Sequence, residues 1–183
     1  MKFNNFKRSL RKVYIALACT LLSISFLFVI RRLLLRLLFG AHVGNNVSVH
    51  SNVYIYNIGG LSIGANSTIN YGSYLDNRGG LLIGSNVNIS HNVRIYTMGH
   101  NIHTAQFESM TKRVVIEDDV WVFPNSILMP GIKLEKGAVV LPGSVVVRDV
   151  LAMEIVGGNP AEKKGVRKVE AGYKLDNNIW CAR

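Results

Sequence analysis

Branched apolar residues recur every six positions along most of the chain, beginning near Val43. A helix repeats its apolar face about every 3.6 residues and a half-buried strand every two, so neither element predicts this spacing. The anchors fall in three registers, the second displaced by two residues from the first: Ile63, Ile69, Leu75; Ile83, Ile89, Ile95; and Ile116, Val122, Leu128, Leu134, Val140, Val146.

The fourth residue after an anchor is small or branched in nearly every case, as at Ser67, Gly79 and Ala138. This pattern predicts triangular coils of about 18 residues with short flat strands, stacked in parallel around an aliphatic column. The anchor points inward, and the small residue, Gly or Asn lets the chain turn. A β-sandwich of short strands gives no reason for one constant spacing. We therefore predict an all-β fold, a parallel β-helix over residues 41–160.

The repeat is interrupted once, between Ile95 and Ile116. The interruption contains Gly99-His100 and is predicted to form an extended loop over residues 97–114. Solenoids place insertions on their surface, and long insertions in compact folds tend to be functional. We therefore expect the candidate site at this loop.

The N-terminal segment, residues 1–40, follows a different pattern. Val13 to Ile30 is an uncharged, mostly apolar run, and Arg31, Arg32 and Arg36 follow among leucines. The run is borderline for a membrane-crossing helix, which needs about 20 apolar residues, whereas Arg among Leu is typical of an amphipathic helix in the membrane interface. No small-residue cleavage site follows the run, so a signal peptide is not expected. Residues 1–40 are predicted to form a membrane-associated helix.

Charge is concentrated in this same segment. The net charge is +10, and residues 1–40 hold eight of the 21 Lys and Arg residues with no acidic residue. A basic block beside an apolar block indicates an anionic membrane surface. Aromatic residues do not alternate with the basic ones as a nucleic-acid platform requires, so no nucleic-acid partner is expected. The two cysteines, Cys19 and Cys181, have neither the spacing of a disulfide framework nor that of a zinc site.

With these motifs, the chain resembles the hexapeptide-repeat acyltransferases, and among them the galactoside, maltose and polysaccharide O-acetyltransferases. The resemblance covers about residues 43–165. It rests on the six-residue anchors, Thr97-Met-Gly-His100 at the loop, Trp121 in the coil that resumes, and Gly157-Gly-Asn-Pro-Ala161 after the last coil. The resemblance implies a left-handed β-helix, a homotrimer with active sites between subunits, acetyl-CoA as cosubstrate and no metal. Residues 161–183 are expected to form a short C-terminal tail.

The resemblance also implies site residues, with His100 matching the catalytic histidine. Glu162 stands where a basic residue is usual, so Lys163 and Lys164 are expected at the coenzyme A phosphates. An acidic residue that contacts the acceptor in the family falls at Arg78. The other positions expected to bind coenzyme A are Asn70, Pro124, Pro142, Val147 and Arg148, and those expected to bind the acceptor are Asp76, Asn77, His103 and Arg113.

Acyl transfer to an alcohol needs a base for the hydroxyl proton and donors for the oxyanion that forms on the thioester carbonyl. Histidine suits the first task because its unperturbed pKa is near 6.5, and backbone N–H groups can serve the second. This chemistry needs neither a cysteine nor a serine nucleophile, and direct attack without an acyl-enzyme intermediate is predicted. Asp76, Glu108 and a backbone carbonyl are all candidates to orient His100.

Two other classes of function remain open. A metal-dependent hydratase of the γ-carbonic anhydrase type needs three histidines converging on zinc, which here means His91, His100 and His103. A non-catalytic scaffold is favoured by bulky Phe123 and by Pro124 and Pro142, where small residues usually line the groove.

The N-terminal segment points to an acceptor held near a membrane, such as a lipid-linked or cell-envelope saccharide. Because coenzyme A is cytoplasmic and the charge bias keeps the N-terminus inside, we expect an interfacial or re-entrant helix. The catalytic domain then lies on the cytoplasmic face of the inner membrane. The alternative is a simple span with the opposite orientation.

Overall fold

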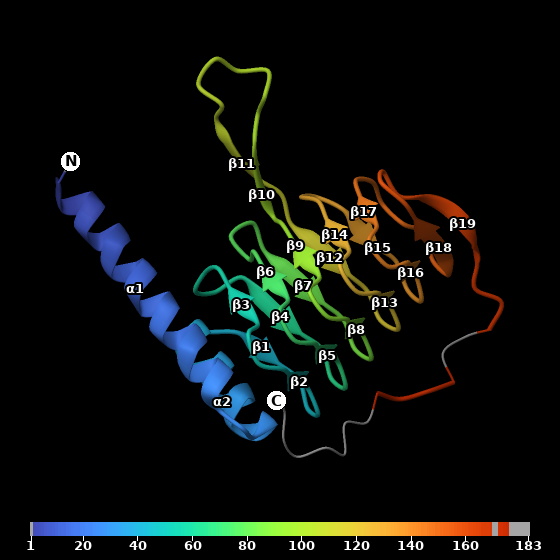
Figure 1. The fold of residues 1–183 in the computed structure, drawn as a ribbon, viewed down its shortest axis with the longest axis horizontal. Coiled ribbons are helices and arrows are strands. Elements are labelled where there is room, and N and C mark those ends of the chain that lie inside the picture. The colour runs from blue at the N-terminus through green and yellow to red at the C-terminus, as the bar shows by residue number, and fades with distance from the viewer. Residues whose placement is uncertain (1, 170–171, 176–183) are drawn as a thin grey trace.

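The computed structural model describes residues 2–169 and 172–175 of the chain. Its body is a parallel β-solenoid of about six turns, with two helices packed at the N-terminal end and a hairpin projecting from one corner (Figure 1). The prediction of a mostly β, parallel coiled fold is confirmed.

Each of the first five turns contributes one short strand to each of three parallel sheets, and the last turn adds a strand to the second sheet. The first sheet contains β1 (His42–Val43), β4 (Leu61–Ile63), β7 (Leu81–Ile83), β12 (Val114–Ile116) and β15 (Lys133–Leu134). The second contains β2 (Ser48–Val49), β5 (Thr68–Ile69), β8 (Asn88–Ile89), β13 (Trp121–Val122), β16 (Val139–Val140), β18 (Glu154–Gly157) and the antiparallel β19 (Glu162–Val166). The third contains β3 (Tyr54–Ile55), β6 (Tyr74–Leu75), β9 (Arg94–Ile95), β14 (Ile127–Leu128) and β17 (Val145–Val146).

The predicted anchors form the core of the solenoid. Every anchor from Ile63 to Val146 is at most 3% exposed. Burying one such side chain contributes about 1.5–3 kcal/mol, so the column of anchors supplies most of the apolar stabilisation. The corners that follow are turned largely by asparagines with positive φ, between 55° and 61°: Asn46, Asn52, Asn66, Asn86, Asn92 and Asn125.

The early coils are longer than the predicted length. Val43 pairs with Ile63 and Ile63 with Ile83, whereas Leu128 pairs with Val146, so each early coil is longer than that later coil by two positions. The extra positions lie at one corner, at Gly59-Gly60 and Gly79-Gly80, where three of the four glycines have φ between 70° and 95°. These two extra positions in each early coil produce the two-residue displacement between the first two registers of anchors. The interruption at residues 97–114 falls at the same corner one coil later.

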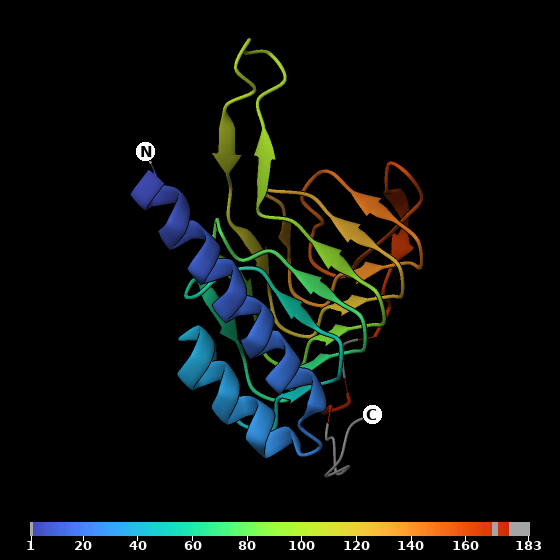
Figure 2. The same ribbon diagram turned by 60° about the vertical axis from the view of Figure 1, so that its left-hand side comes forward.

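The N-terminal segment forms two helices rather than one. α1 (Lys2–Ile24) and α2 (Phe28–Phe39) lie side by side across the first coils (Figure 2). In the described part of the chain, neither helix combines the length and the apolarity needed to cross a membrane. Each buries one face against the solenoid, through Ile15, Ala18, Cys19 and Leu22 of α1 and Phe28, Leu35 and Phe39 of α2.

The break between the helices is built around Arg31, which the sequence placed in a membrane interface. That interpretation is wrong for this residue, because Arg31 is 1% exposed. Its guanidinium donates to the carbonyl oxygens of Ser25 and Val49, both at 2.7 Å, and of Ser23 at 3.3 Å. The Arg31 side chain therefore ties the turn between the helices to strand β2.

The C-terminal tail returns along the second sheet. The ring of Tyr173 packs edge-on against Trp121 at 5.5 Å, and the Leu175 backbone N–H donates to Asn86 Oδ1 at 2.7 Å. Cys181 lies outside the described residues. Cys19 is buried, its thiol donates to the Ile55 carbonyl, and burial raises its pKa.

Candidate active site

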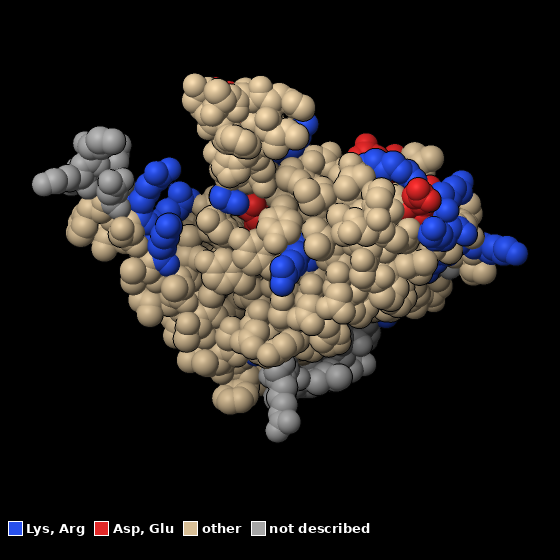
Figure 3. Space-filling model, turned by 45° about the horizontal axis from the view of Figure 1, so that its top comes forward, with Lys and Arg blue, Asp and Glu red and all other residues tan. Residues whose placement is uncertain are grey.

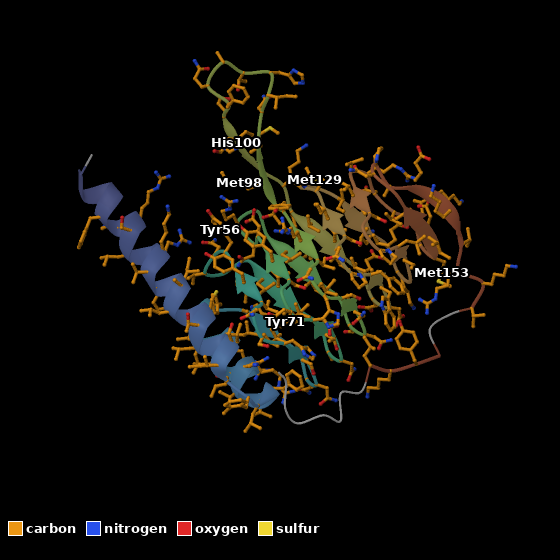
Figure 4. All side chains as sticks on the ribbon, viewed as in Figure 1. Tyr56, Tyr71, Met98, His100, Met129 and Met153 are labelled. Atoms are coloured by element: carbon orange, nitrogen blue, oxygen red, sulfur yellow. The ribbon has the colours of Figure 1, made fainter. Side chains whose placement is uncertain are left out.

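The interruption in the repeat forms a two-stranded antiparallel hairpin, β10 (Met98–His100) and β11 (Ser109–Thr111). Met98 pairs with Thr111, Gly99 with Met110 and His100 with Ser109. Successive side chains of a strand point to opposite faces, so Met98 and His100 share one face of the hairpin and Met110 lies on the other. His100 is exposed at the hairpin base, above Met98 (Figure 4).

Two recesses meet at the foot of this hairpin. The first, here called the hairpin recess, has a volume of about 690 Å³ and is largely apolar. The second, here called the basic recess, has a volume of about 720 Å³ and lies between α1 and the third sheet. Met98 lines both recesses, whereas His100, two residues farther along β10, lines the hairpin recess. The hairpin recess is lined by Tyr96, Met98, Gly99, His100, Met110, Lys112, Ile127, Met129, Pro130, Val145 and Val147. The basic recess is lined by Arg8, Arg11, Lys12, Ile15, Tyr54, Tyr56, Asn57, Arg78 and Met98.

A buried ion pair supports the floor of the basic recess. Arg78 donates to Asp76 through Nε at 2.8 Å and Nη2 at 2.9 Å, and the Asp76 side chain is fully buried. Burial acts to raise the pKa of Asp76, but the hydrogen bonds and charge of Arg78 outweigh it, and the pKa lies below its ordinary value. The hydrogen bond to Asp76 raises the pKa of Arg78. The guanidinium of Arg78 also lies 4.0 Å from the ring centroid of Tyr56.

Asp76 and Asn77 were predicted to contact the acceptor, and their burial does not support this. Asn77 is 1% exposed, and its amide accepts from the Asn57 backbone N–H and donates to the Asn57 and Gly59 carbonyls. Asp76 is 0% exposed and paired with Arg78. Asp76 and Asn77 both stabilise the corner after β6. Their neighbour Arg78 is the residue that lines the basic recess.

The other predicted acceptor residues lie on or beside the hairpin. His103 is exposed near its tip, where its backbone N–H donates to Asn101 Oδ1. Arg113 follows β11, and its side chain lies over Gly80. Among the described residues no hydrogen bond reaches the His100 ring, so the choice between Asp76, Glu108 and a backbone carbonyl as its orienting partner stays open, although Asp76 is already paired.

One predicted coenzyme A contact lies beside His100. Val147 lines the hairpin recess together with His100. The remaining positions line neither recess in a single subunit. Asn70 donates to Asn88 Oδ1 and the Ile89 carbonyl, Arg148 lies 3.8 Å from Glu154, Pro124 is half-buried, and Pro142, Lys163 and Lys164 are exposed.

The cations of α1 and a ladder of tyrosines escaped prediction from sequence. Tyr54 and Tyr74 stack at 5.4 Å between ring centroids, and Tyr96 continues the ladder at 5.5 Å from Tyr74. Burial first, and then the negative charge of Asp76, raises the pKa of Tyr74 to about 12, so this phenol stays neutral at physiological pH. The spacing of Tyr54 and Tyr74 by one full early coil is the one signal in the sequence that could have revealed the ladder.

Comparison with known proteins gives one consistent class. No family model matches the chain. Its structure is similar to a hexapeptide-repeat acetyltransferase of Vibrio cholerae in complex with acetyl coenzyme A, with a TM-score of 0.80 and 28% identity, over 88% of this chain and 89% of that one. The predicted resemblance to hexapeptide-repeat acetyltransferases is confirmed.

Particular neighbours within that class are named for sugar acceptors. A maltose O-acetyltransferase of Clostridium difficile is similar with a TM-score of 0.80 and 28% identity, over 87% of each chain. A galactoside acetyltransferase in complex with coenzyme A shares the fold, with a TM-score of 0.77, 23% identity, and coverage of 85% of this chain and 80% of that one.

Curated relatives match over a shorter stretch. A chloramphenicol acetyltransferase of Klebsiella aerogenes is 51% identical over 68 residues, 36% of this chain and 32% of the relative. A 2,3,4,5-tetrahydropyridine-2,6-dicarboxylate N-acetyltransferase of Clostridium perfringens is 50% identical over 48 residues, 26% of this chain and 20% of the relative. The chain thus spans a third or less of the length of these two relatives, and their acceptors differ.

Among the described residues, no group of three or more His, Cys, Asp or Glu side chains is placed to hold a metal ion.

Proposed function

We propose that this protein is an acetyl-CoA-dependent O-acetyltransferase that acts on a hydroxyl of a saccharide, with His100 as general base. One observation carries the proposal. His100 stands on the projecting hairpin and lines the hairpin recess, which shares Met98 with the basic recess, on a solenoid similar over 88% of its length to an acetyltransferase in complex with acetyl coenzyme A. One recess suits the acyl donor and the other the acceptor.

The chemistry needs a proton acceptor and no covalent intermediate. In the proposed reaction the neutral His100 imidazole takes the proton of the acceptor hydroxyl as its oxygen attacks the thioester carbonyl. The tetrahedral intermediate collapses by breaking the carbon–sulfur bond, and the imidazolium returns the proton to the leaving thiolate. The products are the O-acetyl ester and coenzyme A.

The assay is release of the coenzyme A thiol from acetyl-CoA in the presence of a panel of saccharides. His100→Ala is expected to lower the rate at least a hundredfold, since general-base catalysis contributes about 10²–10⁴-fold. Gln106→Ala, at an exposed residue of the same projecting hairpin, is the control for folding and should retain most of the base-dependent rate. Equal rates for wild type and His100→Ala would refute the role of His100.

The left-handed winding and the homotrimer belong to the same proposal. A neighbouring subunit would bring a second surface to the hairpin, which fits the predicted coenzyme A positions that do not reach His100 within one subunit. Sedimentation of the purified protein tests the trimer, and a monomer with full thiol-release activity would refute it.

A membrane location on the cytoplasmic face of the inner membrane is supported by the outer faces of the two helices. Opposite its buried face, α1 exposes Leu10, Val13, Leu17, Leu21 and Ile24. α2 likewise exposes Val29, Ile30, Leu33 and Leu37. A soluble monomer rarely leaves so continuous an apolar surface uncovered, and a helix with an apolar outer face and nearby cations suits the plane of the interface.

Flotation with phosphatidylglycerol-containing vesicles tests this location. Leu17→Glu, at a residue 61% exposed on α1, should lower the bound fraction several-fold, whereas Val169→Glu, 72% exposed and far from the helices in sequence, should not. Equal binding of both variants would contradict the interfacial position. Protease digestion of sealed vesicles tests the orientation, and a catalytic domain protected on the far side would overturn the cytoplasmic placement.

A scaffold without catalysis is the second candidate, because bulky side chains cluster at β13, where the family resemblance leads us to expect small ones. Trp121 and Phe123 stack at 6.0 Å, and Tyr173 of the tail covers Trp121. No acetyl-CoA binding and no thiol release with any saccharide of the panel would favour this candidate.

A further inference from the structure

The basic recess brings four cations from distant parts of the sequence into one surface. Arg8, Arg11 and Lys12 come from α1, and Arg78 comes from the corner after β6. In Figure 3, basic side chains over α1 face across a hollow toward a basic and an acidic group at the foot of the hairpin. Among the described residues that line the recess, none carries a carboxylate.

Asp76 offsets the charge of Arg78 but not those of the three cations from α1. Asp76 is fully buried beneath the surface and already accepts two hydrogen bonds from Arg78. Among the described residues, neither Arg8 nor Lys12 forms an ion pair with a carboxylate. Three like charges, those of Arg8, Arg11 and Lys12, therefore remain around the cavity; they repel one another, and the repulsion is relieved when an anion enters.

Two of the cations are held in place by their neighbours. Arg11 donates to Asn57 Oδ1, and Arg78 is fixed between Asp76 and the ring of Tyr56. A guanidinium fixed in this way loses little side-chain freedom when it binds, and its planar fork matches the oxygens of a phosphate.

The remaining walls suit a sugar rather than a bare ion. Tyr54 and Tyr56 contribute aromatic surface and phenol hydroxyls to these walls, and the Asn57 amide adds a hydrogen-bonding group. Met98 closes the recess on the hairpin side, and the side chain of His100 lies on the same face of β10 as that of Met98. Two residues of a strand span about 6.6–6.8 Å. A sugar in this recess can therefore present a hydroxyl to His100 while its anionic group remains among the cations.

We infer that the basic recess binds a phosphate or diphosphate ester carried by the acceptor, so that the acceptor is a glycosyl phosphate rather than a neutral sugar. This inference rests on the proposed acetyltransferase function. The same chemistry can come from a nucleotide-linked sugar or from a lipid-linked one. The lipid-linked source fits the helix, because α1 presents its cations to the recess and its leucines to the outside.

Binding measured by calorimetry on the full chain tests the inference separately from catalysis. The probes are inorganic diphosphate, uridine diphosphate, and farnesyl diphosphate held in phosphatidylcholine vesicles. The triple variant Arg8→Gln, Arg11→Gln, Lys12→Gln should bind inorganic diphosphate at least tenfold more weakly than wild type. The control is Arg32→Gln, Lys136→Gln, Lys168→Gln, which removes the same charge outside the recess and should change binding less than twofold.

Further readouts separate the recess from the fold and from the proposed function. Arg8→Lys with Arg11→Lys keeps the charge and should retain most of the diphosphate binding, which a misfolded recess would not.

Tighter binding of the vesicle-held probe than of uridine diphosphate identifies a lipid-linked source, and the reverse identifies a nucleotide-linked source. Acetyl-CoA binding, which is assigned to the hairpin recess, should be unchanged in the triple variant, and its absence in wild type would count against the acetyltransferase alone. Equal diphosphate binding by wild type and the triple variant would overturn the inference.

Discussion

Replacement of Asp76 by Asn tests whether the corner beneath the basic recess depends on a buried charge. The substitution keeps the shape but removes the negative charge that faces Arg78 Nε and Nη2, at 2.8 and 2.9 Å. Removing one partner of a fully buried pair costs about 3–5 kcal/mol. The Arg78 side chain keeps 29% of its surface exposed and can be rehydrated in part. The expected loss in unfolding free energy is therefore about 2–3 kcal/mol at pH 7.

The pH dependence of this loss follows from the direction of the pKa shift. The pKa of Asp76 is lower in the folded chain than its ordinary value of 3.8, chiefly because Arg78 outweighs the effect of burial. The charged form thus stabilises the fold above that value, and the contribution disappears as the pH falls through the lower folded pKa. The difference between wild type and Asp76→Asn should be constant from pH 7 to 5 and should shrink below pH 3.8.

The measurement is urea unfolding followed by circular dichroism at one fixed protein concentration, because a predicted oligomer makes stability depend on concentration. Glu162→Gln, on an exposed position of β19, is the control and should stay within about 0.5 kcal/mol of wild type. If Asp76→Asn unfolds at the same urea concentration as wild type, or if the difference persists unchanged at pH 3, the ion pair does not stabilise this corner.

Three further substitutions test the rest of the fold. Leu128→Ala removes a fully buried anchor of β14 and should lower the unfolding free energy by about 3–4 kcal/mol in the same urea assay. Gly64→Ala would place a Cβ 2.5 Å from the Gly84 carbonyl carbon in the next coil, and the forced separation should lower the unfolding free energy by about 1–3 kcal/mol. In Gly165→Ala the added Cβ would lie 4.0 Å from Ile155 Cδ1, an ordinary contact, so this variant should be neutral in thermal denaturation. Arg31→Met leaves the Ser25 and Val49 carbonyls without their donor. It should lower the unfolding free energy by about 3 kcal/mol and expose the turn between α1 and α2 to limited proteolysis. The control Arg32→Met should have neither effect.

The solenoid could be predicted from sequence because its physics is local and repetitive. Each coil must place a branched residue inside at the same point, so the anchors from Ile63 to Val146 appear directly as a spacing. The same logic located His100, because an insertion breaks the spacing visibly. The greater length of the early coils was less visible, since the added glycines at one corner appear in the sequence only as a displacement of the register.

The N-terminal helices and the basic recess could not be predicted in the same way. Composition alone describes Val13 to Ile30 as one apolar run, and nothing in it marks a break after Ile24. The break depends on a long-range contact, in which the Arg31 side chain reaches the Val49 carbonyl of β2. Likewise, Arg8 and Arg78 are far apart in the sequence, and they line one cavity only because α1 packs across the third sheet.

Helix α1 belongs both to the proposed membrane-binding surface and to the wall of the basic recess, two parts that the sequence predicts as separate units. A membrane segment and a catalytic solenoid could have been independent units joined by a linker. Instead, Ile15 and Cys19 pack into the core of the first coils, while Arg8, Arg11 and Lys12 form one wall of the recess beside His100. The helix proposed to lie on the bilayer therefore also lines the proposed acceptor site. In that arrangement an acceptor anchored in the same bilayer reaches the base without leaving the membrane surface, and deleting α1 should abolish acceptor binding as well as vesicle binding.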